Sequence, residues 1–316
     1  LFHAWNIKTI RPIEMMPYDY TKENYSQLGY VYEGVTTYYG DQILARADVY
    51  SIDQFFVELN IRLQKHFDNP GRFNMSVADS SFDTWLDGYV PGVPGRKTSI
   101  YDEGSLIALM TDLLIRKNTD HKSSLDTVML NLYNDFGKKM RGYTDHDYIS
   151  LVSHCAGVSM ADFFIDFVYG TEDDTPLLEE TLGYAGLELH RYPSTIESER
   201  FFGFKVTEDS RSTKVTAIYP DSPSFKAGLG KDDEIVAVNE KKVEENLQEL
   251  LFLSRGERLI LTVLTPMKRL KDIAIEGDSK EYYPKYAIVK NINADQDQQR
   301  FFKSWLGKDF DESKSL

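Results

Sequence analysis

Cysteine and long hydrophobic runs are scarce in this chain. Its 316 residues include one cysteine, Cys155, which excludes an intrachain disulfide framework and a zinc site built from clustered thiolates. No apolar run approaches the ~20 residues that a membrane-spanning helix requires. Internal repeats and low-complexity segments are also missing. The composition, 41% hydrophobic and 27% charged, is that of an ordinary soluble protein, and it leaves a cytoplasmic or periplasmic location undecided.

Positive charge is scarce in the first part of the chain. Residues 1–190 hold 28 acidic and 15 basic residues (net −13), and residues 191–316 hold 22 and 21 (net −1), which together give the net charge of −14. A segment with this excess of negative charge is not expected to bind nucleic acid, which is itself negatively charged. Acidic surfaces mostly serve solubility, and attraction of a cationic substrate is the alternative. Because the chain opens without Met or a signal-type sequence, we expect it to be a piece of a longer protein.

The periodicity of apolar residues changes near residue 193, and the length also predicts two domains. Before that point, apolar residues recur every three or four positions and predict helices at 21–47, 52–67, 76–86, 101–116, 124–137, 144–155 and 159–169. Glycine and proline at 87–97 predict a loop. After residue 193, strand-like runs at 201–206, 214–219, 234–239 and 258–264 predict a small mixed domain. A strand at 286–292 and an apolar helix at 301–306 follow in the tail.

His3 and Glu33 are the first candidates for chemistry. His3 stands in the opening run Leu1 to Asn6, and Glu33 lies in the aromatic run 30–39. A helical histidine can bind zinc, and a carboxylate within an apolar helix needs a partner, for which a metal ion would serve. The alternative is an exposed His3 and a Glu33 that is hydrogen-bonded to neighbouring tyrosines.

These segments resemble the glycyl aminopeptidases, zinc metallopeptidases related to the thermolysin-like gluzincins. In that family, the sequence HExxH-x-W-N lies on one helix, and a Glu in the context E-G-x-x-x-Y-Y on the next helix is the third zinc ligand. The resemblance implies that His3 is the second histidine of HExxH and that Glu33 is the third ligand. The matching residues are His3 to Asn6, Arg11-Pro12, Pro17 to Tyr20, Glu23 to Tyr25, Glu33-Gly34 and Tyr38-Tyr39.

The resemblance also implies a mechanism and a gap in it. Two histidines four residues apart and one carboxylate leave the fourth zinc position to water, whose proton the motif Glu removes. The first His and the Glu of HExxH would precede Leu1. The chain therefore holds two of three implied ligands and no general base. We expect these 316 residues alone to be an inactive fragment of an active enzyme, and a degenerate non-peptidase is the alternative.

Tyr101 is the candidate for stabilising the oxyanion. The run Ser99 to Gly104 resembles the family's Y-x-x-G segment and opens an apolar helix, and a phenol near zinc can donate a hydrogen bond where negative charge develops. The alternative is a core tyrosine on a helix capped by Ser99. The adjacent pair His154 and Cys155 is a poor nucleophile and base, because neighbouring helical residues point in different directions.

Residues 199–277 resemble a bacterial-type PDZ domain. Ser222 can cap a short helix that opens with Pro223, and Gly228 can end it before a strand at 234–239. The run 201–204 resembles the carboxylate-binding loop, whose backbone N–H groups hold a peptide C-terminus while the peptide adds as a strand. The alternative is a fold that only packs, with an empty groove. The residues implied to bind peptide are Phe202, Gly203 and Phe204.

The sequence as a whole thus predicts a multidomain α and α+β protein. A helical thermolysin-like catalytic subdomain at 1–195 is followed by a PDZ domain at 196–277 and by a tail with a docked helix at 278–316. The family resemblance implies a Zn-dependent aminopeptidase that releases N-terminal Gly or Ala. The alternative is a non-catalytic scaffold protein that binds peptides through its PDZ domain. Peptide substrates and protein C-termini are the expected partners, without nucleic acid and without a transmembrane segment.

Overall fold

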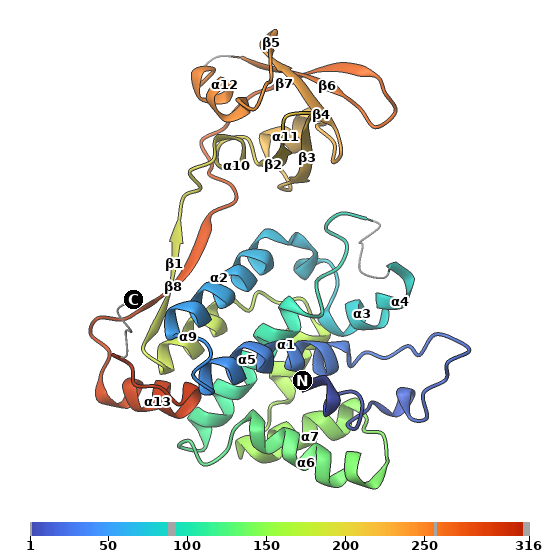
Figure 1. Cartoon of the computed structure of the whole chain (residues 1–316), viewed down its shortest axis with the longest axis vertical. Helices are drawn as coiled ribbons and strands as arrows, with labels where there is room; N and C mark the ends of the chain where they lie inside the picture. Colours follow the sequence, from blue (N-terminus) through green and yellow to red (C-terminus); the bar gives the residue numbers. More distant parts are fainter. Residues whose placement is uncertain (1, 88–92, 256–257, 312–316) are drawn as a thin grey trace. The chain divides into compact units, whose positions relative to one another are not determined.

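The computed structural model describes residues 2–87, 93–255 and 258–311, and its contacts divide the chain into two compact units. The first unit comprises residues 1–190 and 287–316, and the second comprises residues 191–286. After the second unit is complete, the chain therefore returns to the first (Figure 1). Within the described part of the chain, no helix combines the length and the apolar character needed to cross a membrane.

The first unit is helical. Among its described residues, two π-helical segments interrupt the α-helices: η3 (Tyr30–Val35), which continues directly into α1, and η6 (Ile165–Tyr169), which continues α8. Short 3-10 turns occur at η1 (Phe2–Ala4), η2 (Ile13–Met15), η4 (Pro70–Phe73) and η5 (Gly137–Lys139). The α-helices of the unit are α1 (Thr36–Arg46), α2 (Ile52–Asp68), α3 (Val77–Phe82), α4 (Thr84–Asp87), α5 (Asp102–Asn118), α6 (Leu125–Asp135), α7 (Asp145–Ala156), α8 (Ala161–Phe164), α9 (Thr175–Tyr184) and α13 (Gln296–Leu306).

Helix α5 is the central helix of the first unit. Of its 17 residues, 13 are buried, which is more than one apolar stripe of a surface helix can supply. Elements η3, α1, α2, α7 and α9 all contact it (Figure 1). The same hydrophobic core includes Phe302 and Trp305 of α13. The C-terminal helix is therefore part of the core of the first unit.

The predicted helix at 21–47 is shorter in the structure, where helical geometry begins at Tyr30. Asp19 Oδ1 accepts a hydrogen bond from the backbone N–H of Thr21 (2.9 Å), and Asn24 Nδ2 donates to the backbone oxygen of Asp19 (2.8 Å). Such bonds from side chains to the local backbone compete with helix formation. The predicted helix at 76–86 is interrupted at Asp83, and the predicted loop at 87–97 lies partly outside the described residues.

The described residues of the second unit form a six-stranded antiparallel sheet in the order β2-β3-β4-β6-β7, with β5 paired to β4. Strand β2 therefore lies at an edge. Strands β1 (Leu187–Tyr192) and β8 (Lys285–Lys290) pair separately as the chain leaves and re-enters the first unit. The elements between them are α10 (Glu197–Arg200), β2 (Phe204–Glu208), β3 (Thr213–Ile218), α11 (Pro223–Ala227), β4 (Glu234–Val238), β5 (Lys241–Lys242), α12 (Leu247–Leu253), β6 (Leu259–Leu264) and β7 (Leu270–Ile275).

Local signals explain helix α11 of the second unit. The Ser222 hydroxyl accepts from the backbone N–H of Phe225 (3.2 Å), and Pro223 occupies the first helical position. Gly228 ends the helix with a φ of +79°. Glycine adopts this left-handed conformation at little energetic cost because it has no Cβ atom. The predicted short helix is thereby confirmed.

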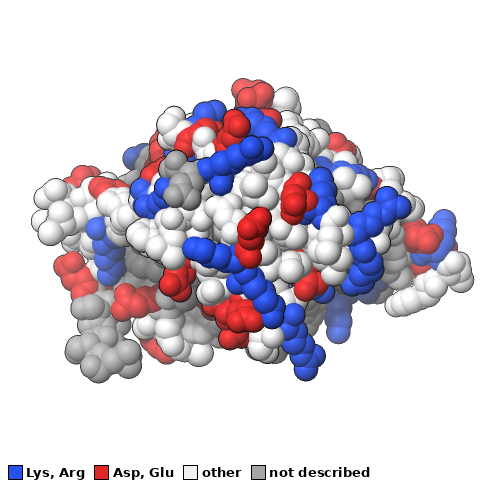
Figure 2. Space-filling model, turned by 90° about the horizontal axis from the view of Figure 1, so that it is seen from above, with Lys and Arg blue, Asp and Glu red and all other residues white. Residues whose placement is uncertain are grey.

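Charged side chains of both signs share the surface. On the face drawn in Figure 2, described Lys and Arg side chains lie among Asp and Glu side chains. In the second unit, Lys285 Nζ lies 2.7 Å from Glu199 Oε2, and Arg255 pairs with Glu197. These two acidic side chains are thus compensated by neighbouring bases.

Candidate metal centre

His3 and Glu33 lie side by side, although they are far apart in the sequence. His3 Nε2 is 3.2 Å from Glu33 Oε2. His3 Nδ1 lies 3.1 Å from the backbone oxygen of Asn6. Because a carbonyl oxygen only accepts, Nδ1 is the donor in this hydrogen bond. With Nδ1 protonated, the neutral form of the imidazole has its lone pair on Nε2, which faces the carboxylate of Glu33. A shared metal ion or a proton must then lie between the two groups.

The spacing of these two atoms fits zinc. Zinc binds imidazole nitrogen and carboxylate oxygen at similar distances, which places two tetrahedral ligand atoms about 3.3 Å apart. The observed distance of 3.2 Å is close to this value. Burial raises the pKa of Glu33, and His3 partly opposes that effect. A cation beside Glu33 would offset the same cost of burial.

Asn6 explains how the segment of His3 reaches the helix of Glu33. Its side chain is fully buried, and Nδ2 donates to the backbone oxygen of Val31 (3.0 Å) and to the hydroxyl of Thr36 (3.1 Å). Both acceptors flank Glu33 along η3 and the start of α1. The π-helical geometry at Glu33 is itself a form that is frequent at functional sites. Asn6 belongs to the sequence motif, but the sequence alone indicates no role for it.

Two glycines allow the first turn of α5 to pack closely against η3. Gly34 follows Glu33, and Gly104 lies one helical turn after Tyr101. A Cβ on Gly34 would lie 2.5 Å from Gly104 Cα, and a Cβ on Gly104 would lie 2.9 Å from Gly34 Cα. Only glycine allows η3 and α5 to approach this closely. The half-buried Tyr101, which precedes α5 by one residue, therefore begins a helix that crosses the segment carrying Glu33.

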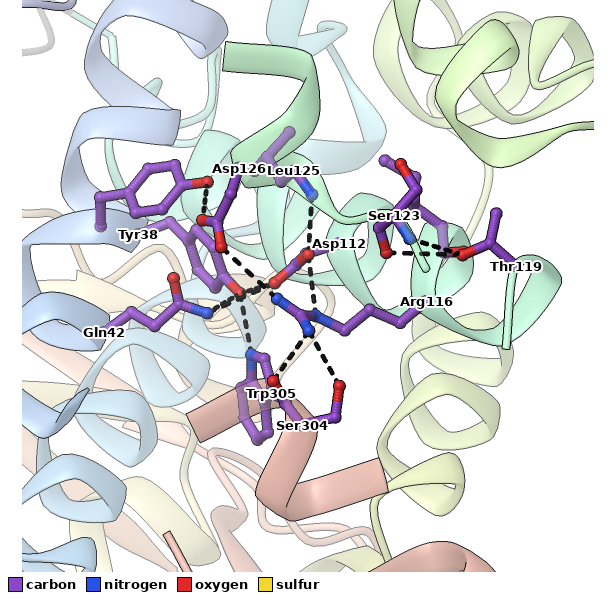
Figure 3. A network of polar contacts seen from close by, with 12 residues as sticks. Tyr38, Gln42, Asp112, Arg116, Thr119, Ser123, Leu125, Asp126, Ser304 and Trp305 are labelled. Atoms are coloured by element: carbon purple, nitrogen blue, oxygen red, sulfur yellow. Dashed lines mark hydrogen bonds and ion pairs between the residues drawn. The ribbon is translucent and has the colours of Figure 1, made fainter. Parts of the chain in front are cut away.

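A buried polar network holds α1 and α5 to the C-terminal helix α13 (Figure 3). The Tyr38 hydroxyl donates to Asp112 Oδ2 (2.6 Å) and accepts from Trp305 Nε1 (2.8 Å). Arg116 Nε donates to Asp112 Oδ1 (3.1 Å), and its Nη1 donates to the backbone oxygen of Ser304 (2.8 Å). Because α1 continues η3, this network also fixes the direction of the helix that presents Glu33.

A second cluster, which we call the His66 cluster, consists of His66, Glu103 and Asp174. It is the one group of three possible metal-ligating side chains found among the described residues, with ligand atoms within 4.8 Å of one another. His66 Nδ1 lies 2.8 Å from Glu103 Oε2, and Nε2 lies 3.3 Å from Asp174 Oδ1. Burial alone lowers the pKa of His66, but the two carboxylates override it and raise the pKa to about 9. Sequence reasoning gave His66 no role, since both partners are distant in the sequence.

Cys155 and the side chains of Phe202 and Phe204 in the predicted peptide loop are buried in the structure. Cys155 is buried while His154 is exposed, and burial raises the pKa of the thiol, which opposes thiolate chemistry. The side chains of Phe202 and Phe204 belong to the core of the second unit. Gly203 has a φ of +71°, and its N–H donates to the backbone oxygen of Glu199 in α10 (3.2 Å).

Comparisons with known proteins relate this chain to peptidases. Residues 1–107 match the model of the M61 glycyl aminopeptidase family. The structure is similar to the crystal structure of an aminopeptidase N family protein from Idiomarina loihiensis, with a TM-score of 0.86 and 26% sequence identity; the match covers 96% of this chain and 53% of that chain. This chain thus spans about half the length of its structural relative. Curated proteins gave no match.

The matched segment contains His3, Glu33 and Tyr101, the three residues to which the family resemblance assigned metal-binding and catalytic roles. The geometric observations above, namely the 3.2 Å contact and the crossing at Gly34 and Gly104, concern the same segment. Over residues 1–107, the resemblance to the glycyl aminopeptidase family that the sequence indicated is therefore confirmed.

Proposed function

We propose that this chain supplies part of the active site of a zinc aminopeptidase that removes N-terminal Gly or Ala from peptides. His3 and Glu33 are two of its zinc ligands, and Tyr101 is its oxyanion donor. The single observation that carries the proposal is the 3.2 Å separation of His3 Nε2 and Glu33 Oε2. The family match over residues 1–107 supports it.

Each residue has a distinct task in this proposal. Zinc, when bound, supplies a Lewis acid that polarises the scissile carbonyl and lowers the pKa of water. His3 is kept in the required tautomer by Asn6, and Glu33 is presented from a buried helical segment. Tyr101 donates a hydrogen bond to the substrate carbonyl oxygen as that oxygen gains negative charge. The remaining histidine and the general base have no counterpart in residues 1–316, so we expect this chain alone to be inactive.

The test compares residues 1–316 with the protein encoded by the complete reading frame. Zinc is measured by atomic emission, and activity is measured on glycyl and alanyl substrates. We expect one zinc per chain and activity in the complete protein, and loss of both in residues 1–316. N-acetylated versions of the same substrates are the control and should not be cleaved, because an aminopeptidase needs a free amine. A metal-free, inactive complete protein would contradict the proposal.

For residues 199–277 we propose a PDZ-type module that binds peptide C-termini, which would be the main function if the complete protein is not an enzyme. Strand β2 lies at the edge of the described sheet and begins at Phe204, the last residue of the run 201–204, so a peptide can add beside it. Helix α12 lies at the end of β2, because the backbone N–H of Leu247 donates to Glu208 Oε1 (3.2 Å).

Peptide binding can be measured on residues 1–316 without any metal. We expect labelled peptides that end in an apolar residue with a free carboxylate to bind about 10- to 100-fold more tightly than the same peptides with a C-terminal amide, since charge-assisted hydrogen bonds contribute about 1.5–3 kcal/mol. Fluorescence anisotropy gives both affinities. Equal affinities, or no binding by any member of a C-terminal peptide library, would contradict the module's proposed role.

A further inference from the structure

We propose that His66 is a positioning residue for Tyr101: through its two ring nitrogens it holds Glu103 and Asp174, and it thereby fixes the start of α5. This inference rests on the proposed role of Tyr101 in a peptidase. Glu103 lies in the first turn of α5, two residues after Tyr101. His66 belongs to α2, and Asp174 is the residue before α9. The cluster thus joins three elements at the base of the turn that carries Tyr101.

One oxygen atom of Glu103 forms two hydrogen bonds that hold the backbone around Tyr101. Glu103 Oε2 lies 2.8 Å from His66 Nδ1 and accepts from the Thr98 hydroxyl at 3.3 Å. Thr98 precedes Tyr101 by three residues, and Glu103 follows it by two. The side chains of His66 and Glu103 are 0% and 9% exposed. Loss of the His66 bond would therefore loosen the backbone on both sides of Tyr101 at once.

The charges around His66 are balanced by a proton. Glu103 and Asp174 face the ring, and Arg72 Nη1 lies 3.2 Å from Asp174 Oδ1 and 3.0 Å from Asp173 Oδ1. Glu172 lines the small cavity beside Glu103 and Asp174. A protonated His66 and Arg72 thus neutralise the two buried carboxylates that contact the ring, as buried charges require. A pKa of about 9 keeps His66 protonated through the neutral range.

The arrangement of the His66 cluster favours a proton over a metal ion. The two carboxylates contact different nitrogens of one imidazole ring, whereas a metal ion binds an imidazole through one nitrogen. One ion could therefore replace only one of the two contacts. His66 Nε2 approaches Asp174 at an ion-pair distance without a well-directed hydrogen bond, and a protonated ring still gains from this contact.

Nuclear magnetic resonance of residues 1–316 labelled with ¹⁵N-histidine tests the protonation directly. At pH 7.5 we expect both ring nitrogens of His66 to be protonated, with a transition near pH 9. The His66→Gln variant identifies the signal, and His190, which forms a half-exposed pair with Glu188 (2.9 Å), is the control. A neutral tautomer at pH 7.5, or ring shifts that change when EDTA is added, would overturn the proposal.

Kinetics on the complete protein test the route through Tyr101. We expect His66→Gln to lower kcat about 10- to 100-fold, because misplacing a catalytic group by about 1 Å has effects of this size, with KM and zinc content unchanged. Tyr101→Phe removes the oxyanion donor. Adding His66→Gln to Tyr101→Phe should then have little further effect, since a residue that acts through another gives non-additive losses.

His190→Gln should leave kcat unchanged as the matched control. Losses of His66→Gln and Tyr101→Phe that simply add, or a loss of zinc in His66→Gln, would overturn the positioning role. An inactive wild-type protein would instead contradict the proposed peptidase and the role of Tyr101 in it. In that case, the resonance experiment still decides whether a protonated His66 bridges the two carboxylates.

Discussion

Replacing Glu33 by Gln is expected to abolish zinc binding in the complete protein and to lower kcat/KM by at least about 10³-fold. The reason is that an amide oxygen is a weaker zinc ligand than a carboxylate, and Lewis-acid stabilisation of the transition state is worth several kcal/mol. Glutamine keeps the size of the side chain, which is 20% exposed, so the fold should survive. Atomic emission gives the zinc content, and steady-state kinetics on a glycyl substrate give the loss.

The chain offers a matched control for this experiment. Glu188 forms a pair with His190 at 2.9 Å, and both side chains are more than 40% exposed. Glu188→Gln changes the same type of pair away from the candidate metal centre and should leave zinc content and kcat/KM unchanged. A Glu33→Gln protein that keeps its full zinc content would show that Glu33 is not a ligand.

Replacing Asp112 by Ala is expected to lower the free energy of unfolding of the first unit by about 3–5 kcal/mol, the usual cost of leaving a buried charge without its partner. Asp112 is 1% exposed and pairs with Arg116, which is 5% exposed. Its loss also removes the acceptors of the Tyr38 hydroxyl and of the backbone N–H of Leu125. Urea unfolding followed by tryptophan fluorescence reports on this unit, because Trp5, Trp85 and Trp305 all belong to it.

Asp135 provides the comparison for Asp112. It also pairs with a base four residues later, Lys139 at 3.4 Å, but both side chains are more than half exposed. Exposed pairs on a helix contribute about 0.3–0.5 kcal/mol, so Asp135→Ala should change the free energy of unfolding by no more than that. Similar losses in the two variants would mean that the network in Figure 3 contributes no more than a surface pair.

Much of the helical unit could be predicted because its signals are local. Predicted helices at 52–67 and 144–155 agree closely with α2 and α7, whose ends are set by capping residues such as Ser51 and Thr144. The start of η3 could not be predicted, because Asp19 and Asn24 redirect the backbone through side-chain bonds that periodicity does not reveal.

The candidate site was also only partly predictable from the sequence. The roles of His3 and Glu33 were predicted through the family motif, whereas spacing alone favoured an exposed His3 without a metal. His66 gave no signal, because its partners Glu103 and Asp174 are brought to it only by tertiary packing. Charged residues within a helix normally indicate an exposed face, so the burial of Glu103 and Asp112 on α5 could be recognised only once their partners were placed.

The return of the chain to the first unit sets an order of events during synthesis. Ribosomes extend a chain at about 5–20 residues per second, and domains fold as they emerge. Residues 191–286 must therefore be synthesised before α13, which takes roughly 5 to 20 s at this rate. Until then, Tyr38 lacks the indole of Trp305, and Arg116 lacks the carbonyl of Ser304. The helix that presents Glu33 thus receives its last buried partners only after the whole of the second unit has been translated.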